Sequence, residues 1–251
     1  FRERVLIFAT RADIPLPPKP TLPKNPRAGL TTTLASIVDP NDDTDRPPMT
    51  AKYLATRTVW NRFFQVLNGA GIAVPRFPVW TDWWGRDLAN LDPTAMASPN
   101  LAEPAFYQKY TTWIDHNVTF YTANRATLDP WLTWARETHP EWTGAVRKLE
   151  WQGGSVGPKS LDGTLWTLRG SGVRVKQPDY SPTLVAMSMI PVYGPHNKRL
   201  SPKELLALQS FAPGFKYDPK AICKQTGNAV NVKMVTWAAE FLTTGVDTLA
   251  L

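Results

Sequence analysis

Prolines decide where helices can form in this sequence. The chain has 24 of them among 251 residues, and a proline interrupts a helix because it lacks the backbone N–H and its ring clashes with the preceding turn. The four prolines within residues 14–20 therefore predict an extended connector, which follows a buried strand predicted over residues 4–9. Pro78, in the aromatic segment 76–84, predicts a packed loop or an edge strand there.

Apolar side chains at helical spacing predict three helices in the first part of the chain. One covers residues 59–67 and is closed by Asn68-Gly69, because glycine readily adopts the left-handed conformation that ends a helix. Another runs from Pro104, a residue well suited to a first helical turn, to about residue 121. The third should start near Pro130 and stop before Pro140.

The second part of the chain changes from helical to β-like patterns and back. Residues 149–189 contain short β-like runs broken by glycines, which predict irregular β structure with loops. Ser201-Pro202-Lys203-Glu204 has the form of a capping box, in which Glu204 closes onto Ser201 at the start of a helix. A last helix is expected after residues 227–230, over residues 232–242, with Gly245 as its end.

Composition limits the class of protein. The chain is 43% hydrophobic and 20% charged, which predicts a folded globular protein of one extended domain or two small ones. Its apolar runs are too short to cross a bilayer, and no secretory leader is visible. One cysteine, Cys223, and three histidines give no basis for a disulfide framework or a metal site. We therefore expect a cytoplasmic protein, and the first residue, Phe1, indicates a fragment or a processed piece.

Charge and tryptophan content each allow two interpretations. The net charge is +7, and the basic excess flanks an acidic centre over residues 77–142, as expected for a one-sided phosphate-facing surface. Ordinary solvated lysines and arginines explain the charge equally well. The tryptophans fit a stacking platform or a packed core, and we expect the core. Those considered are Trp60, Trp80, Trp83, Trp84, Trp113, Trp131 and Trp134.

Three runs of residues form a recognisable set because of their order. The first is Phe1-Arg2-Glu3-Arg4-Val5. After a long stretch come Lys198-Arg199-Leu200-Ser201-Pro202-Lys203-Glu204 with Leu208-Gln209-Ser210-Phe211, and then Lys224-Gln225-Thr226-Gly227-Asn228-Ala229-Val230-Asn231-Val232. In this order they resemble the eighth, ninth and tenth motifs of the cytosine-5 DNA methyltransferases. Lys198 and Ala212-Pro213 depart from the residues that are usual there.

The stretch between these motifs is similar to one bacterial branch of the same family. The similar runs are Arg147-Lys148-Leu149-Glu150-Trp151-Gln152, Ser171-Gly172-Val173-Arg174-Val175-Lys176 and Pro182-Thr183-Leu184-Val185-Ala186. The resemblance implies an α/β protein in which residues 1–30 end a Rossmann-like S-adenosylmethionine-dependent methyltransferase sheet. Residues 31–216 would form a smaller mixed α+β target-recognition domain, and residues 217–251 would return to the catalytic domain.

The reaction of that family needs residues that this sequence lacks. In the family, a cysteine after a proline attacks the cytosine, a glutamate in a Glu-Asn-Val motif holds the ring, and a glycine-rich loop binds the methyl donor S-adenosylmethionine. None of the three is present, and Cys223 follows Ile222 rather than a proline. The chain alone is therefore expected to be inactive. Its implied partners are double-stranded DNA and an N-terminal catalytic half.

The resemblance assigns roles to individual residues of this chain. Arg4, with Arg2 on the same strand face, would bind cytosine O2 and orient the catalytic acid. Gly227, Asn228 and Ala229 would contact the cofactor, with Asn228 capping the last helix. The expected DNA contacts are Arg169, Arg174, Lys176, Thr183, Leu184, Lys198 and Arg199.

Two other classes of protein remain open. A stand-alone sequence-specific DNA-binding module would use the basic flanks without methylation, and its binding to duplex DNA would depend strongly on salt. A tryptophan-rich carbohydrate-binding domain would use the aromatic side chains, but the three motifs weigh against it.

Overall fold

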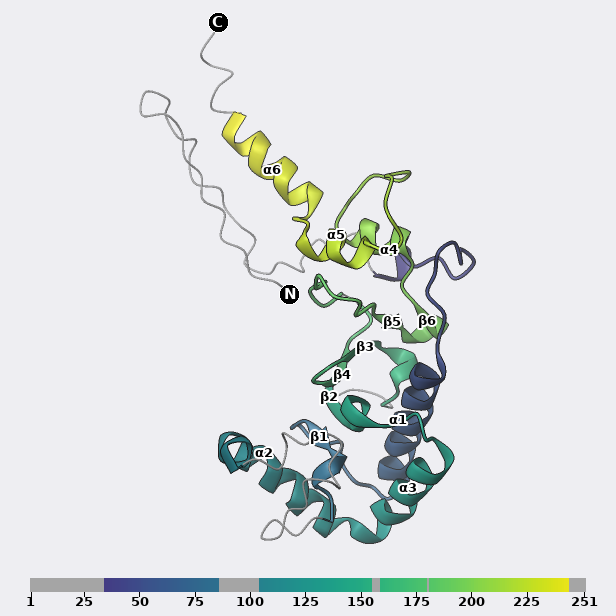
Figure 1. The fold of residues 1–251 in the computed structure, drawn as a ribbon, viewed down its shortest axis with the longest axis vertical. Helices are drawn as coiled ribbons and strands as arrows, with labels where there is room; N and C mark the ends of the chain where they lie inside the picture. Colours follow the sequence, from purple (N-terminus) through teal and green to yellow (C-terminus); the bar gives the residue numbers. More distant parts are fainter. Residues whose placement is uncertain (1–33, 86–103, 155–158, 180, 244–251) are drawn as a thin grey trace, which may run out of the picture. The chain divides into compact units, whose positions relative to one another are not determined.

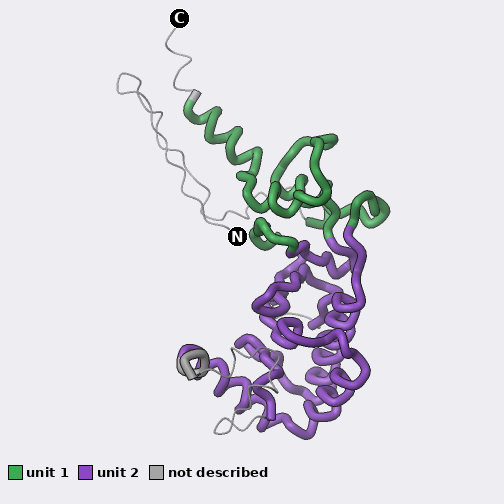
Figure 2. The backbone as a smooth tube through the Cα atoms, in the orientation of Figure 1, with its two compact units in different colours: residues 1–46, 179–188, 200–251 green, residues 47–178, 189–199 purple. Residues whose placement is uncertain are grey.

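The computed structural model describes residues 34–85, 104–154, 159–179 and 181–243. It divides the chain into two compact units, coloured separately in Figure 2: unit 1 comprises residues 1–46, 179–188 and 200–251, and unit 2 comprises residues 47–178 and 189–199. The predicted strand at 4–9 and the connector after it lie outside the described residues. Among the described helices, none is long and apolar enough to cross a membrane.

Helix α1 of unit 2 spans Ala51–Gly69 (Figure 1) and confirms the helix predicted over residues 59–67. It begins earlier than the predicted range because the apolar stripe continues back to Ala55, which is buried. The predicted stop is displaced by two residues. Gly69 is still helical, and the left-handed residue is Gly71, with φ of 67°.

The next two helices are nearly continuous. Helix α2 spans Pro104–Ala123 and starts at the predicted proline, and α3 spans Arg125–Thr138 and stops before Pro140 as predicted. The predicted start of α3 near Pro130 is wrong, because Pro130 lies inside the helix. A missing hydrogen bond at this proline is tolerated because an apolar face of α3 is buried in the core. The buried residues are Leu128, Trp131, Leu132 and Ala135.

The strands of unit 2 form one mixed sheet in the order β1-β2-β4-β3-β5-β6. Their bounds are Val79–Trp80 for β1, Lys148–Gln152 for β2, Leu165–Arg169 for β3, Gly172–Lys176 for β4, Val192–Tyr193 for β5 and Lys198–Arg199 for β6. The β2–β4 pair is parallel and the other pairs are antiparallel. The strand β1 lies at an edge, as predicted for the aromatic segment, and the β structure predicted within residues 149–189 is confirmed.

The core of unit 2 lies between one face of this sheet and the helices α1 and α3. Trp60 is fully buried there, its ring contacts Phe63, Trp131 and Trp142, and its Nε1 donates to the carbonyl of Val146 at 2.9 Å. The expected core role is confirmed for Trp60, Trp83, Trp84 and Trp131, which are buried. It is wrong for Trp113, which remains 41% exposed.

In unit 1, the described elements are a 3-10 turn η1 at Leu34–Ser36 and the helices α4 at Pro202–Leu208, α5 at Ile222–Asn228 and α6 at Val232–Thr243. The predicted capping box of α4 is confirmed. The Ser201 Oγ accepts from the Glu204 N–H at 3.3 Å, and the Ser201 N–H donates to the Glu204 carboxylate at 2.7 Å. Arg46 also binds this buried carboxylate through both terminal nitrogens, each at 2.9 Å.

The last predicted helix is present as α6, but its cap is a different asparagine. Asn228 is the last residue of α5 and is exposed, so it does not cap α6. Instead, the Asn231 Oδ1 accepts from the Met234 N–H at 3.3 Å. Asn231 has this role because it is the residue directly before the first turn. The predicted end at Gly245 lies outside the described residues.

Candidate nucleic-acid interface

The central strands of unit 2 carry charged side chains on the face opposite the core, although Leu165, Thr167 and Tyr193 on the same face are buried. Because successive side chains of a strand point to opposite faces, Leu149, Val173 and Trp166 point into the core while their neighbours in the chain point away. Strand register then places residues of β2, β4, β3 and β6 together on the second face. We call this surface the basic sheet face. It consists of Lys148, Glu150, Arg169, Arg174, Lys176 and Lys198.

Four residues predicted to contact DNA therefore share one surface: Arg169, Arg174, Lys176 and Lys198. Arg199 does not join them, because it pairs with Val192 and points to the other face. Its guanidinium lies 4.6 Å from the centre of the Tyr53 ring and donates to the Pro48 carbonyl at 3.3 Å. These contacts indicate a structural role for Arg199.

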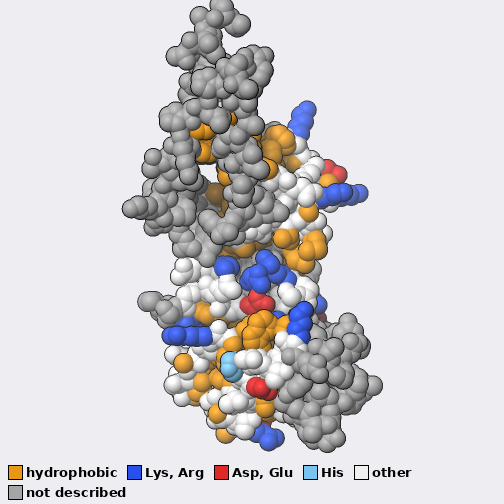
Figure 3. Space-filling model, turned by 90° about the vertical axis from the view of Figure 1, so that its left-hand side faces the viewer, with side chains coloured by type: hydrophobic (Ala, Val, Ile, Leu, Met, Phe, Trp, Pro, Cys, Tyr) orange, Lys and Arg blue, Asp and Glu red, His pale blue; other side chains and the backbone are white. Residues whose placement is uncertain are grey.

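The basic sheet face carries five cationic side chains and one carboxylate, Glu150. The carboxylate accepts from Arg174 Nε at 2.9 Å and from Arg174 Nη2 at 2.7 Å, and it lies 3.6 Å from the Lys148 Nζ. Lys176 donates to the side-chain oxygen of Gln152. Figure 3 shows one face of the molecule on which basic side chains surround an acidic group. The excess of cations suits a polyanionic ligand.

Arg169 is the least satisfied of these cations. Its Nε is buried and has no hydrogen-bond partner among the described residues. Burial lowers the pKa of Arg169, the charge of Arg174 lowers it further, and Glu150 acts in the opposite direction. Buried donors in folded proteins are normally paired.

Two residues of this surface were missed by sequence reasoning. Lys148 lies over the rings of Trp80 and Trp113, with its Nζ 4.7 Å and 5.7 Å from their centres, and Glu150 pairs with Arg174. The signal was the alternation Lys-Leu-Glu-Trp-Gln in β2, which places the first, third and fifth side chains on one face.

The other two predicted DNA contacts lie in unit 1. Thr183 and Leu184 line a small cavity of about 180 Å³ together with Ala229, one of the predicted cofactor contacts. Gly227 has a packing role instead, because a side chain there would come closer than 3.0 Å to the backbone of Val185 and Ala186. Asn228 is exposed.

The remaining predicted positions give little further chemistry. Arg2 and Arg4 lie outside the described residues. Cys223 is a half-buried thiol outside any disulfide. Within the described residues, no group of three or more His, Cys, Asp or Glu side chains is placed to hold a metal ion.

Comparison with known proteins gives one informative similarity. Over 159 residues, 60% of this chain, the sequence is 33% identical to the Type II methyltransferase M.AluI of Cellulosimicrobium cellulans. The matched segment covers 30% of that protein. No protein-family model matches the chain, and no solved structure matches it. The similarity agrees with the sequence resemblance at the level of methyltransferases, and it concerns less than a third of the relative.

Proposed function

We propose that this chain is the C-terminal, target-recognising part of a DNA (cytosine-5) methyltransferase of a restriction-modification system. Such an enzyme transfers a methyl group from S-adenosylmethionine to carbon 5 of cytosine within a specific DNA sequence. The observation that carries the proposal is the 33% identity to a type II methyltransferase over 159 residues. The three ordered motifs add the cytosine-5 chemistry and the C-terminal position. The nucleophile, the acid and the donor-binding loop then belong to an N-terminal half.

The basic sheet face is the surface that we assign to duplex DNA. The hairpin of β3 and β4 carries Arg169, Arg174 and Lys176, and its turn at Gly170 and Ser171 is exposed. The turn extends beyond the strand pairs with β2 and β5, and Arg169 lies directly before it. An arginine in the major groove of B-DNA can bind O6 and N7 of guanine. Lysines on the same face would neutralise phosphates and fix the position of the sheet on the duplex.

The described residues do not form a complete site for S-adenosylmethionine. The cavity that includes Ala229 has a volume of about 180 Å³, whereas pockets for ligands of drug size have about 300–1,000 Å³. Gly227 packs closely against the backbone of residues 185–186, which leaves no space for a ligand on that side. The described residues therefore contribute at most an edge of the cofactor site.

The contribution of this chain is to hold the duplex while the target base leaves the stack. Extruding a base costs a few kcal/mol of stacking and pairing energy, and contacts to the flanking DNA offset that cost. The assignment of Arg4 to cytosine O2 is part of the same proposal and depends on the resemblance alone.

The test is methyl transfer from labelled S-adenosylmethionine to plasmid DNA, followed by bisulfite mapping. The reactions contain this chain, the candidate N-terminal half, or both. We expect label on cytosine only when both are present. In that mixture, Arg169→Gln should reduce labelling, while Lys52→Gln, a matched change at an exposed lysine outside the basic sheet face, should not.

A second candidate function is DNA binding without catalysis. It is favoured by the basic sheet face together with the absence of a Pro-Cys nucleophile from this sequence. It predicts salt-sensitive duplex binding by the chain alone and no label in any reaction. That combination would withdraw the enzymatic proposal.

A further inference from the structure

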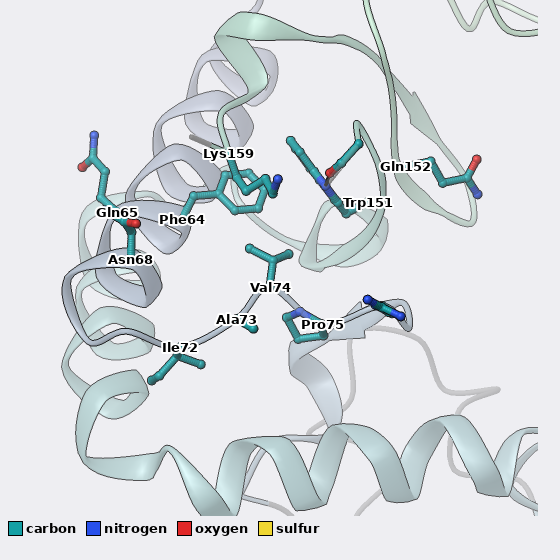
Figure 4. Close-up of a pocket in the computed structure, with 12 residues that line it drawn as sticks. Phe64, Gln65, Asn68, Ile72, Ala73, Val74, Pro75, Trp151, Gln152 and Lys159 are labelled. Atoms are coloured by element: carbon teal, nitrogen blue, oxygen red, sulfur yellow. Dashed lines mark hydrogen bonds between the residues drawn. The ribbon is translucent and has the colours of Figure 1, made fainter. Parts of the chain in front are cut away.

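Unit 2 also has a cavity that the proposed contacts with duplex DNA do not explain. It is a cavity of about 710 Å³ between the end of α1, the segment 72–76 and the end of β2. Figure 4 shows the rings of Phe64 and Trp151 side by side, with Val74 and Pro75 facing them and Lys159 beside Phe64. Phe64 and Trp151 meet edge to face, with ring centres 4.7 Å apart.

Trp151 is held firmly in this cavity. Its Nε1 donates to the Gly154 carbonyl at 3.0 Å, which fixes the orientation of the indole. Phe64 is buried behind it, so the ring of Trp151 is the half-exposed aromatic surface of the site. A fixed aromatic side chain loses little conformational entropy when a flat ligand stacks on it.

The charged residues among the described lining of the cavity, Arg76 and Lys159, are both basic. Arg76 is exposed. Gln65, Asn68 and Gln152 add amide groups. An apolar aromatic floor with cations and amides around it matches a planar heterocycle that carries a phosphate.

The cavity also borders the basic sheet face. Gln152 lines the cavity, and its side-chain oxygen accepts from Lys176 of that face. The volume of about 710 Å³ lies within the range of about 300–1,000 Å³ that is typical of pockets for small ligands. A strand bound to the basic sheet face therefore has a neighbouring pocket for a nucleotide that is not base-paired.

We propose that this cavity binds one unpaired nucleotide of the DNA, with the base on Trp151 and the phosphate at Arg76 and Lys159. This inference rests on the proposed function, because it takes the ligand to be DNA. It predicts tighter binding to a duplex with a short single-stranded extension than to the fully paired duplex. Stacking of the base on Trp151 together with neutralisation of its phosphate by Arg76 and Lys159 should raise the affinity about tenfold, and both contacts are needed to hold the nucleotide.

The test measures fluorescence anisotropy of labelled DNA with the full 251-residue chain. The two ligands are a fully paired duplex and the same duplex with a three-nucleotide single-stranded extension. We expect the gain of about tenfold from the extension to fall to less than about threefold in the Arg76→Gln, Lys159→Gln double variant. The Lys52→Gln variant should keep the gain. These surface substitutions avoid Trp151, which packs on the core residue Phe64.

The outcomes separate the cavity from the proposed function. Equal and tight binding of both DNAs would overturn the nucleotide site and leave the proposed function in place. Failure of both DNAs to bind would overturn both. A gain that persists in the double variant would show that the extension binds elsewhere and would overturn the assignment. Saturable binding of free deoxyadenosine monophosphate, without a gain from the extension, would assign the cavity to a free nucleotide and overturn its assignment to DNA.

Discussion

Replacing Glu150 by glutamine should strengthen the binding of duplex DNA. Glu150 is the one carboxylate of the basic sheet face, and it holds Arg174 through two hydrogen bonds of 2.9 Å and 2.7 Å. While Arg174 is held in this way, its charge is already neutralised and is less available to a phosphate. Glutamine keeps the size and a hydrogen-bond acceptor but removes the charge.

The expected gain follows from counter-ion release. Each additional phosphate contact makes the slope of log K against log salt more negative by about 0.9. At 0.1 M salt, relative to 1 M salt, one such contact raises the affinity by about eightfold. The cost to folding is small, because the side chains of Arg174 and Glu150 are 33% and 15% exposed and pairs near the surface contribute about 0–1 kcal/mol.

The assay is a salt titration of duplex binding, with anisotropy measured between 0.05 and 0.3 M salt on the order of five concentrations. The matched control is Glu141→Gln, which makes the same change in net charge at an exposed residue outside the basic sheet face. We expect a steeper slope only for Glu150→Gln. Weaker binding by Glu150→Gln would refute the reasoning and show that Glu150 orients Arg174 for the DNA. An equal gain in the control would show that net charge alone is responsible.

Three further predictions concern stability, measured by urea unfolding. Gly194→Ala should lower the unfolding free energy by about 3 kcal/mol, because the new Cβ would overlap two backbone carbonyl oxygens. The control Gly163→Ala should cost far less, because no atom lies within 4 Å of the position of its new Cβ. Glu204→Ala should cost about 3 kcal/mol, because it removes the buried partner of Arg46 together with half of the capping box, while Arg46 keeps the exposed Asp43 as an ion-pair partner. Loss of the cap in Ser201→Ala should cost about 1 kcal/mol, and equal costs would contradict this. A hydrogen bond from the Tyr121 hydroxyl holds the pKa of Asp129 below its usual value. The ionised Asp129 carboxylate therefore stabilises the fold above about pH 4, and this contribution is lost as pH falls further. The stability deficit of Asp129→Asn should therefore shrink in acid, and a deficit independent of pH would contradict the assignment.

Local signals in the sequence predicted local structure well. The capping box at Ser201 and Glu204 was recognisable because both partners lie within one helical turn. The start of α3 was not, because the buried face of that helix outweighs the preference of Pro130 for a first turn. Asn228 and Asn231 are equally good caps by type, and only the actual end of α5 decides between them.

Pairing between distant segments could not be predicted in the same way. Glu150 meets Arg174 because β2 and β4 are parallel neighbours, a pairing between residues 24 positions apart. No local pattern specifies this register, which depends on how the whole sheet assembles. The sequence therefore indicated which arginines were candidates for DNA binding but not which of them are already paired within the fold.

The residues that carry the resemblance to methyltransferases are largely used for packing inside unit 1. Gln209 donates to the Thr226 carbonyl at 2.8 Å, Asn231 donates to the Leu208 carbonyl at 3.3 Å, and Gly227 allows close contact with residues 185–186. The first two contacts join the ninth-motif run to the tenth-motif run, and the third joins the tenth-motif run to residues 185–186. Gln209, Gly227 and Asn231 therefore have a structural role, and none of these three touches DNA in our proposal. On the basic sheet face, the pair of Arg174 and Glu150 is partly exposed. In our proposal, substitutions of Arg174 or Lys176 change DNA binding and leave unit 1 folded, whereas substitutions of Gln209, Gly227 or Asn231 affect the folding of unit 1 first.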